Sequence, residues 1–229
     1  MDNFSSARSQ PVVLSSSTEA QTYLLLALAL GLSALGTFLG FGFVGYVGTP
    51  LLFLALIAEL AIIFTSRWWI EARPLNYLLF ALFPVLSGFT FAPYIIAILA
   101  GYVNGASILL NAILATVMMT LAAAVFARTT SWNLGVMGRA LFFAVLGLIG
   151  FGILQIFIPA LRGTGGEMLI SGAGIVVFGI FTAFDIQRVQ AMGRLGANPV
   201  MLALSLYLDI FNLLLYILRF MLAISGQRR

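Results

Sequence analysis

Seven long apolar stretches, joined by short loops, take up most of the 229-residue sequence. About 20 apolar residues suffice for an α-helix to cross the hydrocarbon core of a bilayer, which is roughly 30 Å thick. Hydrophobic residues make up 62% of the chain and charged residues only 8%, too few to cover a water-soluble core of this size. We predict an all-α integral membrane protein, a seven-transmembrane-helix bundle. Its helices are expected at residues 20–42, 50–70, 75–97, 104–127, 134–158, 167–192 and 199–224.

Polar residues flank this membrane domain at both ends. Residues 1–19 are rich in serine, have no periodic apolar face, and lack the apolar core and cleavage site of a signal peptide. We predict a disordered cytosolic tail at 1–19, a seven-helix membrane domain at 20–225 and a short tail at 226–229.

The arginines indicate how the helices are oriented, because cytoplasmic loops carry an excess of positive charge. With the N-terminus inside the cell, Arg162, Arg228 and Arg229 would lie outside and seven others on the cytoplasmic side. We therefore predict a multi-pass protein, surrounded by membrane lipid, with a cytoplasmic N-terminus and an external C-terminus. The arginines are scattered rather than clustered, so no nucleic-acid partner is expected. The seven cytoplasmic arginines are Arg8, Arg67, Arg73, Arg128, Arg139, Arg188 and Arg194.

The last apolar stretch carries polar side chains at helical spacing. Five polar residues follow one another at steps of four, three, four and three, so they form one stripe along a helix. Charged side chains at bilayer depth are costly and are rarely left facing lipid. The stripe is therefore expected to face protein or water. Its members are Ser205, Asp209, Asn212, Tyr216 and Arg219.

Two aspartates are predicted to lie at the same depth. The sixth segment is expected to stop at Gly196, and the seventh to begin with Asn198 as its N-cap and Pro199 as its first helical residue. Asp185 and Asp209 each lie twelve residues from the centre of this turn. In an antiparallel helical hairpin, equal distance from the turn means equal height. We predict the two carboxyl groups at one level, in the cytoplasmic half of the bilayer.

Two neighbouring carboxyl groups in a poorly solvated site cannot both ionise cheaply, so they can share a proton. With the shared proton, the pair ties the two helices together by a hydrogen bond. Without it, the pair repels itself and becomes an oxygen-rich, doubly negative site for a hard cation such as Ca²⁺. A proton-controlled gate on a cation path, with Asp185 and Asp209 as pH sensor and transient Ca²⁺ ligands, is the resulting hypothesis.

A purely structural role for these charges is the alternative. Asp185 could pair with Arg188, one turn away on the same helical face, or with Arg67. A second polar pair, Glu59 and Arg219, is expected in the outer half of the bilayer. There it could act as an ion pair that holds the bundle or as a pore constriction.

Missing residue types exclude several classes of protein. The chain has no cysteine and no histidine, and none of its eleven basic residues is a lysine. A disulfide framework is thus excluded, zinc and haem sites lose their commonest ligand, and a retinal Schiff base has no amine. Serine- and metal-dependent hydrolysis inside the membrane is disfavoured by the same lack of histidine. We expect no cofactor and no enzymatic activity.

Intramembrane aspartyl proteases also use two aspartates on neighbouring helices. Those enzymes share a GxGD motif, whereas Asp209 follows Leu206, Tyr207 and Leu208. Because paired carboxylates alone specify no reaction, the protease is a remote alternative.

The run LALSLYLDIFNLLLYILRF, residues 202–220, resembles the last transmembrane signature of the transmembrane Bax-inhibitor-motif family, in its bacterial branch. The resemblance extends to Glu59, to residues 87–90 with Pro93, and to FTAFDIQ at 181–187. It implies a seven-helix bundle in which the last helix is central and two three-helix layers surround it.

The resemblance also implies a pH-sensitive calcium leak whose paired-aspartate sensor matches Asp185 and Asp209. In the family, an arginine late in the second helix can latch onto that sensor. Ile70 stands at the matching position here, with Arg67 and Arg73 one turn to either side, so Arg67 is the candidate latch.

These expectations combine into a Ca²⁺- and H⁺-responsive leak in the inner (plasma) membrane of a bacterium. The family resemblance also covers regulators that bind other membrane proteins, including proteases. A non-conducting regulator with a membrane-protein partner is therefore the main alternative.

Overall fold

The computed structural model describes residues 17–43 and 49–226, and in these ranges every regular element is a helix. Six helices are long and apolar enough to cross a membrane, which confirms the prediction of an all-helical membrane protein. The α-helices are α1 (Thr18–Phe43), α2 (Thr49–Phe64), α3 (Ser66–Trp69), α4 (Leu75–Gly101), α5 (Gly105–Thr129), α6 (Gly138–Phe157), α7 (Thr164–Gly193) and α8 (Pro199–Ser225). Two short 3₁₀ helices are η1 (Leu134–Met137) and η2 (Pro159–Arg162).

The second predicted segment, residues 50–70, differs from the other six. It is divided into α2 and α3, and the apolar part of α2 is shorter than a standard membrane span. Thr65 lies between the two helices, and its hydroxyl donates to the carbonyl oxygen of Ala61 at 2.5 Å. Such a bond back to the preceding turn competes with the regular helical pattern. The count of seven segments thus becomes six long helices and one shorter, interrupted one.

The predicted domain boundaries fall close to helix ends. Helix α1 begins at Thr18, and the hydroxyl of Ser17 accepts a hydrogen bond from the backbone N–H of Ala20 at 3.2 Å, as an N-cap does. Helix α8 ends at Ser225, followed by Gly226 in the left-handed conformation. Residues 1–16 and 227–229 lie outside the described residues, and with them Arg8, Arg228 and Arg229.

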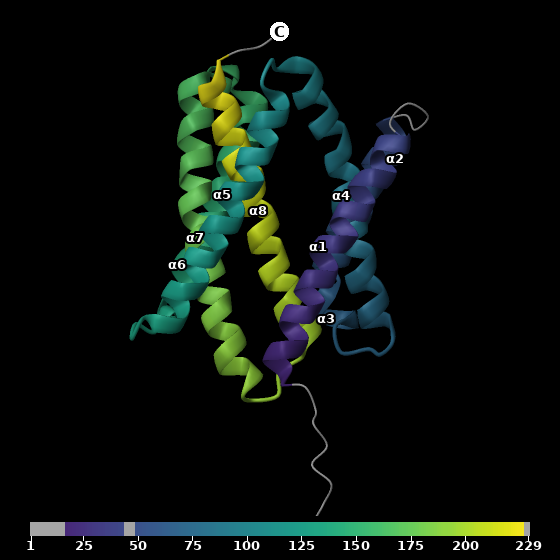
Figure 1. Ribbon diagram of the computed structural model, residues 1–229, viewed down its shortest axis with the longest axis vertical. Helices are drawn as coiled ribbons and strands as arrows, with labels where there is room; N and C mark the ends of the chain where they lie inside the picture. Colours follow the sequence, from purple (N-terminus) through teal and green to yellow (C-terminus); the bar gives the residue numbers. More distant parts are fainter. Residues whose placement is uncertain (1–16, 44–48, 227–229) are drawn as a thin grey trace, which may run out of the picture.

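Helix α8 runs between two groups of helices. It lies between α1, α2 and α4 on one side and α5, α6 and α7 on the other, and it packs against α1, α4, α5 and α7 (Figure 1). Within its apolar window 56% of the residues are buried, against 17% in α5. Tyr207 and Leu213 of α8 are fully buried and belong to two different core clusters. The last helix is thus the one around which the core is built.

The turn between α7 and α8 has the predicted form. Gly196 adopts a φ of 74°, which is a conformation that glycine tolerates best. The side chain of Asn198 caps α8 by accepting a hydrogen bond from the backbone N–H of Val200 at 2.9 Å, with Pro199 at the first helical position. The Asn198 amide also donates to the carbonyl oxygen of Ile70 at 2.7 Å, which fixes the end of α3 to this turn.

Small residues bring the backbones of α1 and α4 together. A Cβ added at Gly36 would clash with the backbone of Val85, and one added at Gly88 would clash with the backbone of Ser33. Glycine thus allows close packing of α1 and α4. Helix α6 differs, because three of its four glycines have no neighbouring atom within 4 Å of an added Cβ. These are Gly147, Gly150 and Gly152.

Most described arginines gather at one end of the molecule. The start of α1, helix α3 and the α7–α8 turn lie at this end, and the end of α8 lies at the other (Figure 1). Arg162, in η2, belongs to the opposite end. The distribution along the molecule agrees with the predicted one, with Arg67, Arg73, Arg128, Arg139, Arg188 and Arg194 toward the α3 end.

Substitution of glycine by alanine should separate the two kinds of glycine. We expect Gly88→Ala to lower the free energy of unfolding by about 1–3 kcal/mol, because the new methyl group meets backbone that cannot move aside. Gly150→Ala meets open space and should be neutral or slightly stabilising. Thermal unfolding of both variants in the same detergent measures the difference, and equal midpoints would contradict the close α1–α4 contact.

Candidate functional site

Asp185 and Asp209 meet at the interface between α7 and α8. They are 2% and 6% exposed, and their carboxyl groups are close enough to interact directly. Both helices turn over at the α3 end of the molecule, so the pair lies toward that end. The structure therefore brings together the two carboxyl groups that the equal spacing from the turn predicted.

This aspartate pair has few partners. Nη1 of Arg188 lies 3.6 Å from Oδ1 of Asp185, a weak ion pair one helical turn along α7. In the described part of the chain, neither oxygen of Asp185 has a hydrogen-bond partner, and Oδ2 of Asp209 has none. Buried carboxylate oxygens without donors are costly, so a proton or a cation at this site would satisfy them.

Arg67, the candidate latch, is not brought to the aspartate pair. It lies on α3 with an exposed side chain and forms no ion pair with any residue in the described ranges. The carbonyl oxygen of Ile70, the position that the family resemblance assigned to the latch, accepts hydrogen bonds from the side chains of Asn76 and Asn198. Arg188 is the arginine next to the pair in this conformation.

The polar stripe of α8 faces α7 and a cavity beside it. Ser205 lies next to Asp185, and the ring of Tyr216 stacks on that of Phe178 with centroids 5.5 Å apart. Asn212 donates to the carbonyl oxygen of Leu208 in its own helix at 2.8 Å. A cavity of about 310 Å³ between α6, α7 and α8 is lined by three stripe residues, Asp209, Asn212 and Tyr216.

The predicted pairing of Glu59 with Arg219 is wrong. Arg219 instead binds Glu167, with Nε 2.5 Å from Oε2 and Nη2 3.0 Å from Oε1. Glu59 accepts hydrogen bonds from the hydroxyl groups of Thr90 at 2.7 Å and Ser87 at 3.1 Å. The reason is packing: α2, which carries Glu59, lies against α4, whereas α7 and α8 pack along each other.

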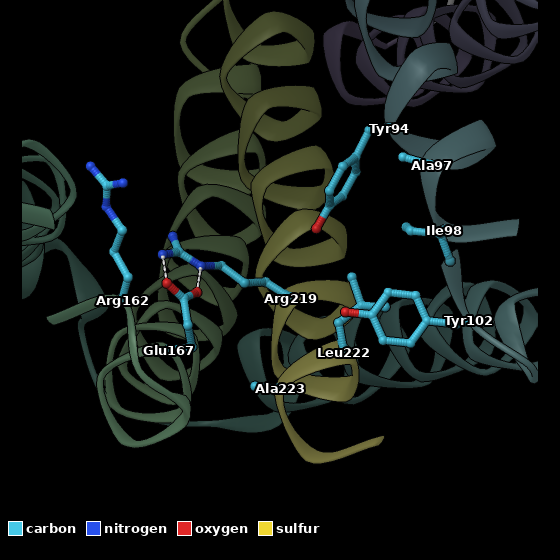
Figure 2. Close-up of a pocket in the computed structure, with 9 residues that line it drawn as sticks. All are labelled: Tyr94, Ala97, Ile98, Tyr102, Arg162, Glu167, Arg219, Leu222 and Ala223. Atoms are coloured by element: carbon cyan, nitrogen blue, oxygen red, sulfur yellow. Dashed lines mark hydrogen bonds and ion pairs between the residues drawn. The ribbon is translucent and has the colours of Figure 1, made fainter. Parts of the chain in front are cut away.

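The Arg219–Glu167 ion pair belongs to a polar cluster at the end of the molecule opposite the aspartate pair. Gln155 of α6 accepts from Nη2 of Arg219 at 2.6 Å and donates to Glu167 at 3.0 Å. Figure 2 shows Arg219 reaching from α8 to Glu167 in the first turn of α7. The ion pair lines a cavity of about 320 Å³ whose other walls include Tyr94 and Tyr102.

Sequence reasoning missed Glu167 and Gln155 as partners of Arg219. A topological signal existed, because Glu167 begins the sixth predicted segment and Arg219 lies near the end of the seventh. Antiparallel neighbours place those two positions at the same end of the bundle. Gln155 had no comparable signal, since it occurs singly in an apolar segment.

A second polar contact that the sequence did not indicate lies on the other face of α8. The hydroxyl groups of Tyr207 and Ser33 are 2.6 Å apart, and Tyr207 is fully buried. Ser87, which holds Glu59, is also close to Tyr207. Together these groups connect the half-buried Glu59 of α2 through Ser87 of α4 to the buried Tyr207 of α8 and Ser33 of α1.

No group of three or more histidine, cysteine, aspartate or glutamate side chains that could hold a metal ion occurs within residues 17–43 and 49–226. The aspartate pair supplies two carboxylates, whereas a resident Ca²⁺ takes six to eight oxygen ligands in total. These two side chains alone would supply only part of that number.

The two glutamate–arginine pairs allow a comparison of ion pairs. We expect Glu167→Gln to lower the free energy of unfolding more than Glu19→Gln, because it leaves Arg219 without its carboxylate in a half-buried site. Glu19 pairs with Arg128, whose side chain is 55% exposed, and exposed pairs contribute at most about 1 kcal/mol. Thermal unfolding of both variants tests this. A larger loss for Glu19→Gln would mean that the Arg219 cluster is not what holds α6, α7 and α8 together.

Comparison with known proteins places this fold and these residues in a family. Residues 16–227 match the family described as inhibitor of apoptosis-promoting Bax1. The chain is 27% identical to the Campylobacter jejuni protein Cj0236c over 210 residues, which cover 90% of this chain and 88% of the relative. It is 28% identical to the inner membrane protein YbhL of Escherichia coli over 185 residues, covering 76% of this chain and 74% of YbhL. The chain therefore belongs to the Bax inhibitor-like family of membrane proteins.

Proposed function

We propose that this protein is a pH-sensitive calcium leak of the membrane, gated by Asp185 and Asp209. The observation that carries the proposal is the pair of buried carboxyl groups on adjacent helices, with oxygens that lack hydrogen-bond donors. Ionisable groups inside a membrane domain are by default candidates for ion or proton pathways. Asp209 itself lies on α8, which contacts helices of both groups and can transmit a change between them.

The gating step follows from the chemistry of two carboxyl groups. When they share a proton, a carboxyl-to-carboxylate hydrogen bond holds α7 against α8. When the proton leaves, two negative charges face each other at low dielectric, so they repel, and a cation stabilises them. Proton binding and cation binding thus compete for the same oxygens. Arg188, next to Asp185, biases this competition through its positive charge.

Polar side chains extend from the aspartate pair toward the opposite end of the molecule. Asn212 and Tyr216 follow Asp209 along α8, and Arg219 with Glu167 marks the far end of the same stripe. We propose that a cation passes along this stripe when α7 and α8 separate. The Arg219–Glu167 ion pair would then be the second constriction, in the role that sequence reasoning gave to Arg219 and Glu59.

We also propose seven membrane crossings, with α2 and α3 together forming the second. Figure 1 supports this, because α2 begins at the end of the molecule where α1 ends, and α3 lies where α1 begins. By the positive-inside rule, the arginine-rich end, and with it the N-terminus, faces the cytoplasm. The inner membrane of a bacterium is the proposed location, as for the relative YbhL.

The main test is Ca²⁺ entry into dye-loaded liposomes that contain the purified protein, measured from about pH 5 to 8. We expect a sigmoidal dependence of the entry rate on pH for the wild type. Asp185→Asn and Asp209→Asn should each flatten or displace this curve, because the pair can no longer share and lose a proton.

Liposomes without protein, and Glu19→Gln, which alters an exposed ion pair far from the aspartates in sequence, serve as controls. A pH dependence of Ca²⁺ entry that neither aspartate substitution changes would contradict the proposed sensor. Absence of flux in folded protein would favour the alternative, a non-conducting regulator that binds other membrane proteins. Cleavage of a membrane peptide that both substitutions abolish would favour the remote alternative, an aspartyl protease.

A second test separates the two arginines that could act on the sensor. We expect Arg188→Gln to displace the midpoint of the pH curve, because it removes the positive charge 3.6 Å from Asp185. Arg67→Gln removes an exposed charge that makes no ion pair in the described part of the chain and should leave the midpoint in place. A larger displacement for Arg67→Gln would show that Arg67 reaches the pair in another conformation, as a latch does.

A further inference from the structure

Asp209 opens into a cavity on the membrane side of the molecule. The cavity, of about 310 Å³, lies between α6, α7 and α8, and α8 makes no extensive contact with α6. Its walls are apolar except for the polar stripe, and Phe142 and Ile149 of α6 are themselves exposed on the outer surface of the bundle. A molecule dissolved in the bilayer therefore reaches Asp209 without passing through water.

The two carboxyl groups near this cavity differ in their positively charged neighbours. Arg188 lies beside Asp185, so one carboxylate already has a positive neighbour. Asp209 is 94% buried, as its exposure of 6% shows, and its Oδ2 has no partner among the described residues. The α6 residues that line the cavity carry no charge, since they are Phe142, Val145, Leu148 and Ile149. Asp209 is therefore the carboxyl group of the pair that lines the cavity, and it forms no ion pair with any described residue.

Aromatic side chains form much of the wall of this cavity. Phe142, Phe178, Phe181 and Tyr216 line it, and the ring of Phe178 stacks on that of Tyr216 with centroids 5.5 Å apart. They offer an apolar surface for the body of a ligand, and Asp209 is the one charged side chain among the described residues that line the cavity. The volume is at the lower limit of small-molecule pockets, which suits one ring with a short alkyl chain.

We propose that this cavity binds a lipophilic ammonium ion, an amine whose apolar body enters from the bilayer and whose N–H groups donate to Asp209. The ammonium places a positive charge and N–H donors beside the carboxyl group of Asp209. A neutral molecule of the same shape would fill the cavity without pairing with that charge. The inference does not depend on the proposed calcium leak, because binding can be measured without ion flux.

The molecule provides a matched control cavity. A second membrane-side cavity, of about 360 Å³, lies between α1, α5 and α8 and includes Ile113, but no charged residue lines it. Ile149 in the first cavity and Ile113 in the second are 53% and 50% exposed. Ile149→Trp and Ile113→Trp therefore block two cavities of similar size by the same change on equally exposed helix surfaces.

The test uses purified full-length protein in lipid nanodiscs and phenylbutylamine that carries a photoreactive diazirine on its ring. Labelled peptides are located by mass spectrometry, and unlabelled phenylbutylamine and phenylbutanol compete for the site. We expect label on α6 and α7, and competition by the amine at a concentration about thirtyfold lower than by the alcohol, as for loss of one partner of a buried charge pair. Asp209→Asn should abolish that advantage of the amine. Ile149→Trp should reduce the labelling, and Ile113→Trp should leave it unchanged.

Equal competition by amine and alcohol would overturn the proposal, because a charged partner for Asp209 would then play no part. Equal labelling of both cavities, or an unchanged amine advantage in Asp209→Asn, would overturn it as well. If Asp209→Asn does not fold, two measurements still test the proposal. One is the competition by amine and alcohol on the wild type, and the other is the labelling of the two tryptophan variants. Protein that binds the amine but passes no Ca²⁺ would contradict only the leak, and the reverse result only the amine site.

Discussion

The cost of placing charge inside a membrane domain determines much of this structure. Asp185 and Asp209 are buried in the interface between α7 and α8, and Arg219 reaches Glu167 across the same pair of helices. Neither arrangement is possible unless α8 is surrounded by other helices, since lipid would not solvate these groups. Helix α8, which carries both Asp209 and Arg219, is consequently the most buried of the long helices.

Buried charged side chains have different surroundings at the two ends of the α7–α8 interface. At one end, Arg219, Glu167 and Gln155 satisfy one another, so the charges are compensated and the three helices are joined. At the other end, Asp185 and Asp209 remain short of donors, with Arg188 at a longer distance. A satisfied cluster holds a structure in place, whereas an unsatisfied one changes with the proton or cation that it meets. This difference is why the aspartate pair, rather than the Arg219 cluster, is the proposed sensor.

The helices on the other face of α8 depend on close packing more than on charge. Gly36 and Gly88 allow the backbones of α1 and α4 to touch, and the hydroxyl groups of Tyr207 and Ser33 join α8 to α1. Glu59 is held by two hydroxyl groups of α4 and by no cation in the described part of the chain. Helices α1 and α4 thus pack closely on one side of α8, and the charge-bearing α7–α8 interface lies on the other.

Local and topological features could be predicted from the sequence because they depend on spacing. Helix lengths follow from apolar stretches, the α7–α8 turn follows from Gly196, Asn198 and Pro199, and the meeting of the two aspartates follows from their equal distance from that turn. Each of these needs only the rise of a helix and the chemistry of its ends. The residues of the last helix likewise indicated the family. The family model then matched residues 16–227, which confirms it.

The partners of Glu59 and Arg219 depended on which helices pack together, and spacing along the chain does not specify that. Two residues at similar depth can pair only if their helices are neighbours, and α2 lies against α4 rather than beside the end of α8. The tertiary structure also decided that Gly147 and Gly150 of α6 face open space while Gly36 of α1 faces backbone, although all are glycines in apolar helices. The sequence by itself thus determined six long helices, the α7–α8 turn and the equal height of Asp185 and Asp209. Only the packing of whole helices decided which charges meet, because burial and contact are properties of neighbouring surfaces.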